Sequence, residues 1–316
     1  MHTSKHLFSA LIAIAIILSS CKTNKPTSLR PMGLTAEPHI TLSAGDLTAT
    51  FSDNTAFGEH SDRYNGIAAL SHTKENGPLF VPAYAGFNIE HVFGGDSLIQ
   101  LFEPRLHPME LFRKSASEVV LYQSATPLSE TESVTTFKLV PPHYIDIEFT
   151  CRFISTKFFK HGYAGIFWAS YINEPTDKSI YFFGKKLSES PSWIAAYSPE
   201  HGTVSTHRSV TDTTNLFFAP DFNARLASHF SDYRFVQPFY YGRFRDMAFA
   251  YLFGENSLIR FSQSPTGGGE KNPAWDFQFI IPDPQPDKPY SFKCRLVYKP
   301  FTTSEDIREE YEKWKK

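Results

Sequence analysis

The segment from Glu103 to Glu110 (EPRLHPME) gathers two carboxylates, an imidazole and a guanidinium between prolines. Histidine titrates near neutral pH, and a nearby carboxylate can orient it or exchange a proton with it. We therefore expect Glu103 and His107 to act as an acid/base pair, with Arg105 as a charged clamp for a substrate. The alternative is a solvated turn whose charges pair with one another.

A second candidate group begins at His161 and continues along the apolar segment 163–173. Flat aromatic rings stack on the apolar face of a sugar, while amide and hydroxyl groups bind its hydroxyls. We expect His161 to transfer protons, and three residues to hold a sugar, namely Trp168, Tyr171 and Asn173. The alternative is a core strand with a hydrogen-bonded histidine at its edge.

A third candidate group is the alternating set of Tyr241, Arg243 and Arg245. Two arginines on one strand face can clamp a carboxylate or a sulfate, so this group predicts an acidic sugar. The alternative is a cationic ladder that pairs with acidic side chains of the next strand. Trp275 follows a flexible glycine-rich loop, 264–269, which could close over a ligand and bring the tryptophan to stack on it.

Cofactor and nucleic-acid signatures are weak. No Lys-Ser/Thr pair follows the glycines at 267–269, which argues against a nucleotide site. There is no HExxH or CxxC motif, and the 12 histidines are scattered, although Glu90 and His91 could join another histidine around a metal. We predict no cofactor. A net charge of −2 without a basic stripe gives no reason to expect nucleic-acid binding.

Alternation of apolar and polar residues is the main structural signal. In 143–153 one face carries apolar residues only, and the other carries polar ones, as in a half-buried strand. The segment 291–298 near the C-terminus alternates in the same way. Two further segments, 163–169 and 247–253, are apolar on both faces, which indicates strands that lie between layers.

Composition and repeats narrow the fold class. Aromatic residues make up 16% of the chain, with 30 Phe and 15 Tyr, and aromatics favour strands. The one good helix is 304–316, with a threonine cap, acidic residues in its first turn and lysines at its end. No repeat of fixed period suggests a propeller. We predict an all-β fold, a large antiparallel two-sheet sandwich with a short C-terminal helix.

The N-terminus carries an export signal. Lys5 precedes the apolar run 7–18 (LFSALIAIAIIL), which is too short to span a bilayer as an anchor. The following Leu-Ser-Ser-Cys at 18–21 resembles the lipobox of bacterial lipoproteins, which implies cleavage before Cys21 and lipid on its thiol. The polar segment 22–36 would be a tether. Lys22 in place of aspartate favours the periplasmic face of the outer membrane, with the lipid as the only membrane contact.

The two remaining cysteines, Cys151 and Cys294, would then lie in an oxidising compartment. Both occur in strand-like segments. They could form a disulfide or remain as two buried thiols, because pairing geometry cannot be read from the sequence.

Three segments carry a family resemblance. The order of GIAALSH (66–72), ETESVTTFKLVPPHYIDIEFTCRF (130–153) and NPAWDFQFIIP (272–282) resembles the galactose-mutarotase-like super-sandwich of carbohydrate-active proteins. The resemblance would cover most of 40–300. It implies a super-sandwich domain over 37–303 that binds a carbohydrate.

The resemblance also implies a function. We expect the chain to process its carbohydrate by acid/base chemistry, as a hydrolase, lyase or epimerase. The alternative is a non-catalytic carbohydrate-binding or envelope-assembly module. For an enzyme, the segments 103–110, 161–173 and 240–246 should meet in one cleft.

Overall fold

The computed structural model of the protein describes residues 28–75, 77–254 and 258–315. Strands dominate it, and they are joined mostly by loops. The strands are β1 (Ala36–Glu37), β2 (His39–Ala44), β3 (Leu47–Ser52), β4 (Gly66–His72), β5 (Asn88–Phe93), β6 (Glu110–Arg113), β7 (Glu118–Gln123), β8 (Thr131–Val140), β9 (Tyr144–Phe153), β10 (Tyr163–Ala169), β11 (Ile180–Lys185), β12 (Ser192–Ala196), β13 (Thr206–Ser209), β14 (Phe230–Phe235), β15 (Phe239–Phe244), β16 (Met247–Phe253), β17 (Ile259–Ser264), β18 (Ala274–Pro282) and β19 (Pro289–Pro300). The helices are α1 (Glu103–Leu106), α2 (Arg225–Ser228) and α3 (Ser304–Trp314).

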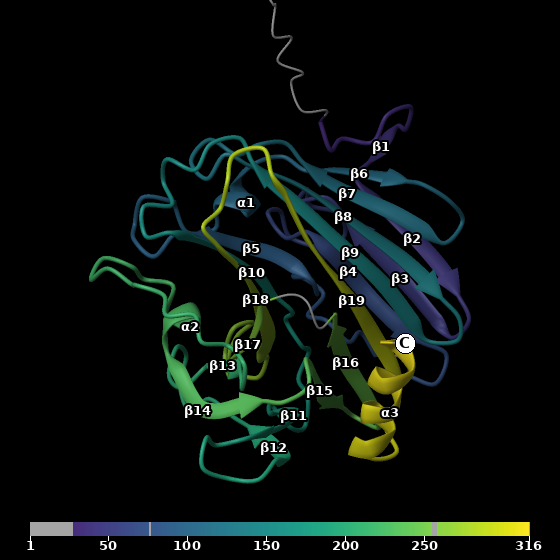
Figure 1. Ribbon diagram of the computed structural model, residues 1–316. Coiled ribbons are helices and arrows are strands. Elements are labelled where there is room, and N and C mark those ends of the chain that lie inside the picture. The colour runs from purple at the N-terminus through teal and green to yellow at the C-terminus, as the bar shows by residue number, and fades with distance from the viewer. Residues whose placement is uncertain (1–27, 76, 255–257, 316) are drawn as a thin grey trace, which may run out of the picture.

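One sheet supplies both layers of the sandwich. Sixteen strands are hydrogen bonded in the order β1-β6-β7-β8-β9-β19-β16-β15-β11-β14-β13-β17-β18-β10-β5, with β12 beside β11 (Figure 1). The sheet folds back on itself, because strands far apart in this order face each other through the core. Phe149 of β9 lies 4.8 Å from Trp168 of β10 between ring centroids, and Phe277 of β18 lies 5.7 Å from Phe292 of β19.

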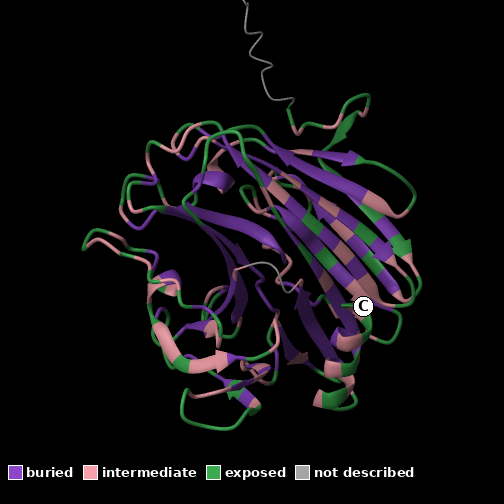
Figure 2. Ribbon diagram, in the orientation of Figure 1, coloured by how far each residue is buried: buried purple, intermediate pink, exposed green. Residues whose placement is uncertain are grey.

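A three-stranded sheet, β2-β3-β4, closes one side of this core. Its Phe51 lies 5.0 Å from Phe137 of β8 between ring centroids, and both rings are fully buried. The outer face of β8, β9 and β19 is open to solvent, so buried residues alternate with more exposed ones along much of these strands (Figure 2). The all-β prediction is confirmed, as is the antiparallel sandwich; β13 and β14 form a parallel pair within it.

The local predictions from periodicity hold. In β9 the apolar residues from Ile145 to Phe153 are buried at every second position, and Glu148 on the other face is exposed. The C-terminal helix α3 begins after Thr303, whose hydroxyl accepts a hydrogen bond from the amide of Asp306. Ile307 and Tyr311 of α3 are fully buried, so this helix packs against the sheet.

Cys151 and Cys294 are free, buried thiols. The register of β9 and β19 places Cys151 opposite Tyr290 and Cys294 opposite Ile147, so the two thiols lie at separate positions along the strand pair. The disulfide alternative is therefore wrong for this structure.

The N-terminal boundary of the domain also needs correction. Ser28 donates a hydrogen bond to Glu132 (2.6 Å), Arg30 forms an ion pair with Glu110, and β1 pairs with β6. Residues 28–36, expected to be tether, thus lie on the domain. The lipidation site Cys21 lies outside the described residues. Within the described residues, no helix is long and apolar enough to cross a membrane.

Candidate active site

A pocket of about 180 Å³, partly open to solvent, lies beside β5 and β18. Aromatic and ionisable side chains line it together. They include Glu90, His91, Phe93, Phe102, Phe167, Tyr171, His201, Asn223, Arg225, Leu226 and Asp276.

Strand periodicity explains how β10 and β18 supply the pocket. In β18 the aromatic side chains of Trp275 and Phe277 point into the main core, whereas Asp276 between them points to the opposite face. In the same way Phe167 points to the pocket, and its neighbour Trp168 belongs to the main core. We call these two sides the core face and the pocket face.

A β-bulge in β5 places two adjacent ionisable side chains at the pocket. The pairing with β10 shifts there, because Phe167 lies opposite His91 and Trp168 lies opposite Ile89, which leaves Glu90 as the extra residue. Ile89 and Val92 remain in the main core, while Glu90 and His91 both line the pocket. A regular strand would have sent one of them to each face, so the bulge builds this part of the site.

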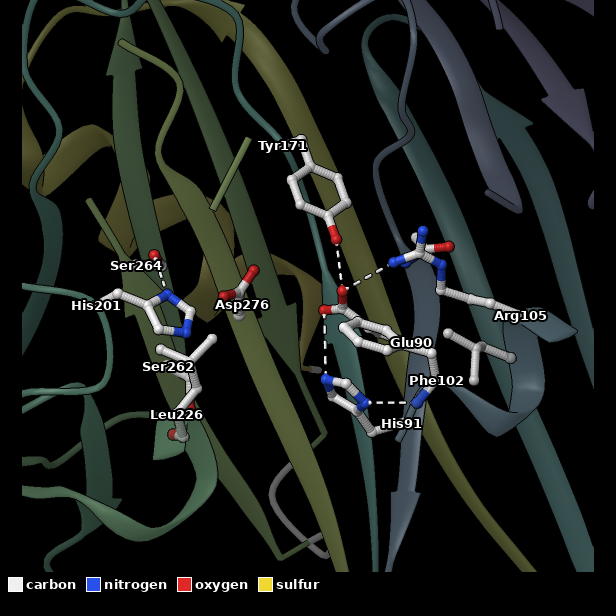
Figure 3. Close-up of polar contacts among 12 residues, drawn as sticks. Glu90, His91, Phe102, Arg105, Tyr171, His201, Leu226, Ser262, Ser264 and Asp276 are labelled. Atoms are coloured by element: carbon white, nitrogen blue, oxygen red, sulfur yellow. Dashed lines mark hydrogen bonds and ion pairs between the residues drawn. The ribbon is translucent and has the colours of Figure 1, made fainter. Parts of the chain in front are cut away.

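Glu90 is the centre of a buried polar network (Figure 3). Its Oε1 accepts a hydrogen bond from the hydroxyl of Tyr171 (2.6 Å) and one from Nη1 of Arg105 (3.1 Å). Burial first, and then the charge of Glu90, raise the pKa of Tyr171 well above its ordinary value, so its phenol remains a donor. Arg105 in turn lies over the ring of Tyr64, 3.9 Å from its centroid. The network holds Glu90 in a fixed position as a paired carboxylate.

His91 has a defined proton arrangement. Its Nδ1 accepts a hydrogen bond from the amide of Phe102 (3.1 Å), so a neutral ring carries its proton on Nε2. Nε2 lies 3.9 Å from Oε2 of Glu90. Burial lowers the pKa of His91 despite the opposing charge of Glu90, which favours the neutral form.

Asp276 is the second carboxyl group of the pocket and lies in a different environment. It is fully buried, and its Oδ1 accepts a hydrogen bond from the amide of Ser170 (3.2 Å). Its Oδ2 has no hydrogen-bond partner among the described residues. Burial first, and then the charge of Glu90, raise the pKa of Asp276 well above its ordinary value, which favours the protonated acid.

The covering loops supply the other wall. Nδ1 of His201 lies 2.9 Å from the hydroxyl of Ser264, and the ring also lines the pocket. Asn223 comes from the loop that enters α2, and Arg225 and Leu226 come from α2 itself. In the view of Figure 3, Asp276 lies between His201 on one side and the Glu90 network on the other.

Two of the residues expected from the sequence take part in this site. Tyr171 lines the pocket, and Arg105 pairs with Glu90 as described above. Both were expected to hold substrate. The sequence suggested only one role for their partner Glu90, as a ligand of a metal together with His91 and another histidine.

The acid/base roles expected for the segment 103–110 and for His161 do not fit the geometry. Glu103 is fully buried, and its carboxylate accepts hydrogen bonds from the amides of Leu128 (2.6 Å) and Ser129 (3.0 Å), which gives it a structural role in fixing that turn. The carbonyl of His107 accepts from Asn54, and its ring is outside the set that lines the pocket in the described chain.

His161 lies in the loop before β10. Its Nε2 is 3.1 Å from Oδ2 of Asp96, and its ring packs 4.7 Å from Phe217 between centroids. Like His107, it is outside the set of described residues that line the pocket.

The two tryptophans are part of the core. Trp168 is fully buried and stacks on Phe277 with 5.0 Å between ring centroids. Trp275 is also fully buried, and its indole donates to the carbonyl of Lys178 (3.0 Å). Strand alternation directs both away from the pocket face, so neither can stack on a sugar there.

The expected anion clamp on β15 faces another part of the molecule. Tyr241 bonds to Ser304 at the start of α3 (2.6 Å), and Arg243 lies 4.0 Å from the ring centroid of Phe301. Arg245 forms an ion pair with Glu75. Helix α3 and its leading segment cover this face of β15.

Asn173 donates instead to the carbonyl of Pro78 (3.3 Å). The described residues therefore do not bring 103–110, 161–173 and 240–246 into one cleft. In the described part of the chain, no group of three or more His, Cys, Asp or Glu is placed to hold a metal ion, so Glu90 and His91 gain no third ligand there.

The residues that sequence reasoning missed include Asp276, His201 and Arg225. The strict alternation in 274–279 (AWDFQF) contains the signal for Asp276, because a carboxyl between two core-facing aromatics must point to the opposite face. No comparable signal exists for His201, which reaches the pocket from a long irregular loop.

Comparison with known proteins gives distant structural neighbours. The sequence matches no protein-family model and no curated protein. An aldose epimerase homologue from C. elegans aligns with a TM-score of 0.49 at 10% identity, over 85% of this chain and 100% of its own. A mutant heparan sulfate lyase from Pedobacter heparinus aligns with a TM-score of 0.43 at 10% identity, over 86% of this chain but only 37% of the lyase. The function therefore has to be inferred from the pocket itself.

Proposed function

We propose that the protein is a carbohydrate-active enzyme that binds a sugar ring in the pocket beside β5 and β18 and transfers protons on it. One observation carries this proposal: two carboxyl groups of one pocket lie in opposite environments. Glu90 is paired with Arg105 and Tyr171, and Asp276 is buried with a free oxygen. Such a pair divides into a base and an acid.

The lining of the pocket suits a sugar. The rings of Phe167, Phe102 and Tyr171 offer apolar surface to the C–H face of a pyranose. Polar groups converge on the same space, and each can donate to or accept from a hydroxyl group. We assign Glu90 as the base and Asp276 as the acid, and we assign His91 as the residue that orients Glu90.

This assignment leaves three reaction classes, namely epimerisation, elimination and hydrolysis. In all three classes an acid donates a proton to an oxygen of the sugar, and a base removes a proton from a carbon, a hydroxyl group or a water molecule. The protein from residue 28 onward should be incubated with a panel of neutral, uronic and sulfated sugars, with products followed by NMR. An anomeric exchange, an unsaturated product or a new reducing end identifies the class.

Matched variants test the residue roles. Glu90→Gln and Asp276→Asn keep the side-chain size and should lower kcat by about 10²–10⁴-fold while substrate binding is retained. Asp246→Asn, at an exposed position in the turn after β15, is the control. Activity that survives in both pocket variants contradicts the proposal. If both variants change only binding and no member of the panel is converted by the wild type, a non-catalytic binding module is indicated.

We further propose that the enzyme is a lipoprotein at the periplasmic face of the outer membrane. The lipobox-like sequence that ends at Cys21 supports this location. Cys21→Ser should leave an unlipidated or uncleaved precursor. Unchanged partition of that variant into detergent would refute the anchor.

A further inference from the structure

Arg225 is an unpaired cation at the proposed sugar pocket. It lines the pocket from the first position of α2 and is exposed. No described residue forms a hydrogen bond or an ion pair with its guanidinium, whereas Arg105, which is outside the described lining, is paired with Glu90. A guanidinium presents a planar set of donors that matches a carboxylate or a phosphate.

The other ionisable groups leave this charge uncompensated. Glu90 and Arg105 balance each other. Burial raises the pKa of Asp276 and lowers that of His91, so both favour their uncharged forms. Neither carboxyl group of the described lining therefore pairs with Arg225, which lies on the wall formed by the covering loops and α2.

The covering loops add further polar groups to the same pocket. Asn223 and His201 line the same pocket from the covering loops. Gly202, with φ of +73°, allows Arg225 to come close, because a Cβ atom there would lie 2.5 Å from Cβ of Arg225. The approach of these two loops is thus built into the backbone.

We propose that Arg225 selects a sugar that carries an anionic group, held at the loop wall while the ring faces Glu90 and Asp276. This inference rests on the proposed function and specifies its substrate class. A uronate carboxylate and a sugar phosphate share the required chemistry. An acidic sugar was expected from Arg243 and Arg245, but Arg225 is the arginine that lies at this pocket.

Calorimetric binding of four probes tests the proposal: glucose, glucuronate, glucose 6-phosphate and inorganic phosphate. The wild type should bind at least one of the two anionic sugars about tenfold to a hundredfold more tightly than glucose. The stronger of the two identifies the anionic group. Arg225→Gln should remove this preference and keep the affinity for glucose, and Arg225→Lys should restore part of it. Arg113→Gln, an exposed arginine on β6, is the matched control and should leave all affinities unchanged.

The outcomes separate the two proposals. Equal binding of glucose and both anionic sugars, or a preference that survives in Arg225→Gln, overturns the role of Arg225 and leaves the sugar-binding function intact. Phosphate binding that is lost in Arg225→Gln, without binding of any sugar, supports the anion site and contradicts the function. Absence of binding for all four probes overturns the anion site as well.

Discussion

Replacement of Asp276 by asparagine tests the protonation state on which the site depends. Asparagine has nearly the same size, and its carbonyl oxygen can still accept the hydrogen bond from the amide of Ser170. It cannot ionise. The variant therefore removes the titration of this buried group and retains its packing.

The magnitude follows from linkage. In the unfolded chain Asp276 loses its proton near its ordinary pKa of 3.8, whereas burial raises the pKa in the folded protein. Between these two values the folded state binds more protons than the unfolded state, so the contribution of Asp276 to stability is greatest at low pH and is lost as the pH rises. The slope reaches about 1.4 kcal/mol per pH unit. Above about pH 4, the free energy of unfolding of Asp276→Asn should therefore rise relative to that of the wild type, by up to about 1.4 kcal/mol per pH unit.

Urea unfolding at half-unit steps from pH 4.5 to 8 measures this difference. The comparison with wild type at each pH cancels the titration of all other groups, and Asp246→Asn serves as an exposed control. A difference between Asp276→Asn and the wild type that does not change with pH would mean that Asp276 is ionised in the folded protein. The assignment of Asp276 as the acid would then be wrong.

Three further predictions concern the scaffold. Burial lowers the pKa of His207 to about 4, so the unfolded chain binds a proton at a higher pH than the folded protein does. Relative to His207→Leu, the wild type should lose up to about 3 kcal/mol of stability between pH 6.5 and 4. A difference in urea unfolding that does not change with pH would contradict this. Glu103→Ala leaves the amides of Leu128 and Ser129 without their acceptor and should lower the free energy of unfolding by about 1–3 kcal/mol. It should not cause the large loss of kcat expected for Glu90→Gln. A loss of kcat without a loss of stability would indicate that Glu103 is catalytic. Phe149→Ala removes a fully buried ring and should lower the free energy of unfolding by about 3–5 kcal/mol, whereas Glu148→Gln at an exposed position should lower it by about 0.5 kcal/mol or less. Equal effects in urea unfolding would refute the burial pattern of β9.

The scaffold was predictable where the signal is local. Alternation identified the buried residues of β9, and the cap and charge pattern identified α3. Both depend on side chains close in sequence, because the period of a strand or a helix alone decides which side chains share a face.

The site was predictable only in part, because it depends on events that no local pattern fixes. The bulge in β5 breaks the alternation, so period-two reasoning separates Glu90 from His91, which the structure brings together. The segment 103–110 is dense in charged residues, which predicted a catalytic role, yet the carboxylate of Glu103 accepts a hydrogen bond from the backbone amide of Leu128 in a neighbouring turn. Arg225 and His201 reach the pocket through long irregular connections whose course depends on the whole sandwich.

The most direct test of the proposed function is a crystal structure of the protein with the sugar that binds most tightly in the panel. We predict the ring between the pocket face of β18 and the Glu90 network, with a sugar oxygen within hydrogen-bond distance of Oδ2 of Asp276. A sugar bound outside this pocket, for example beside the exposed Arg245 in the turn after β15, would contradict it.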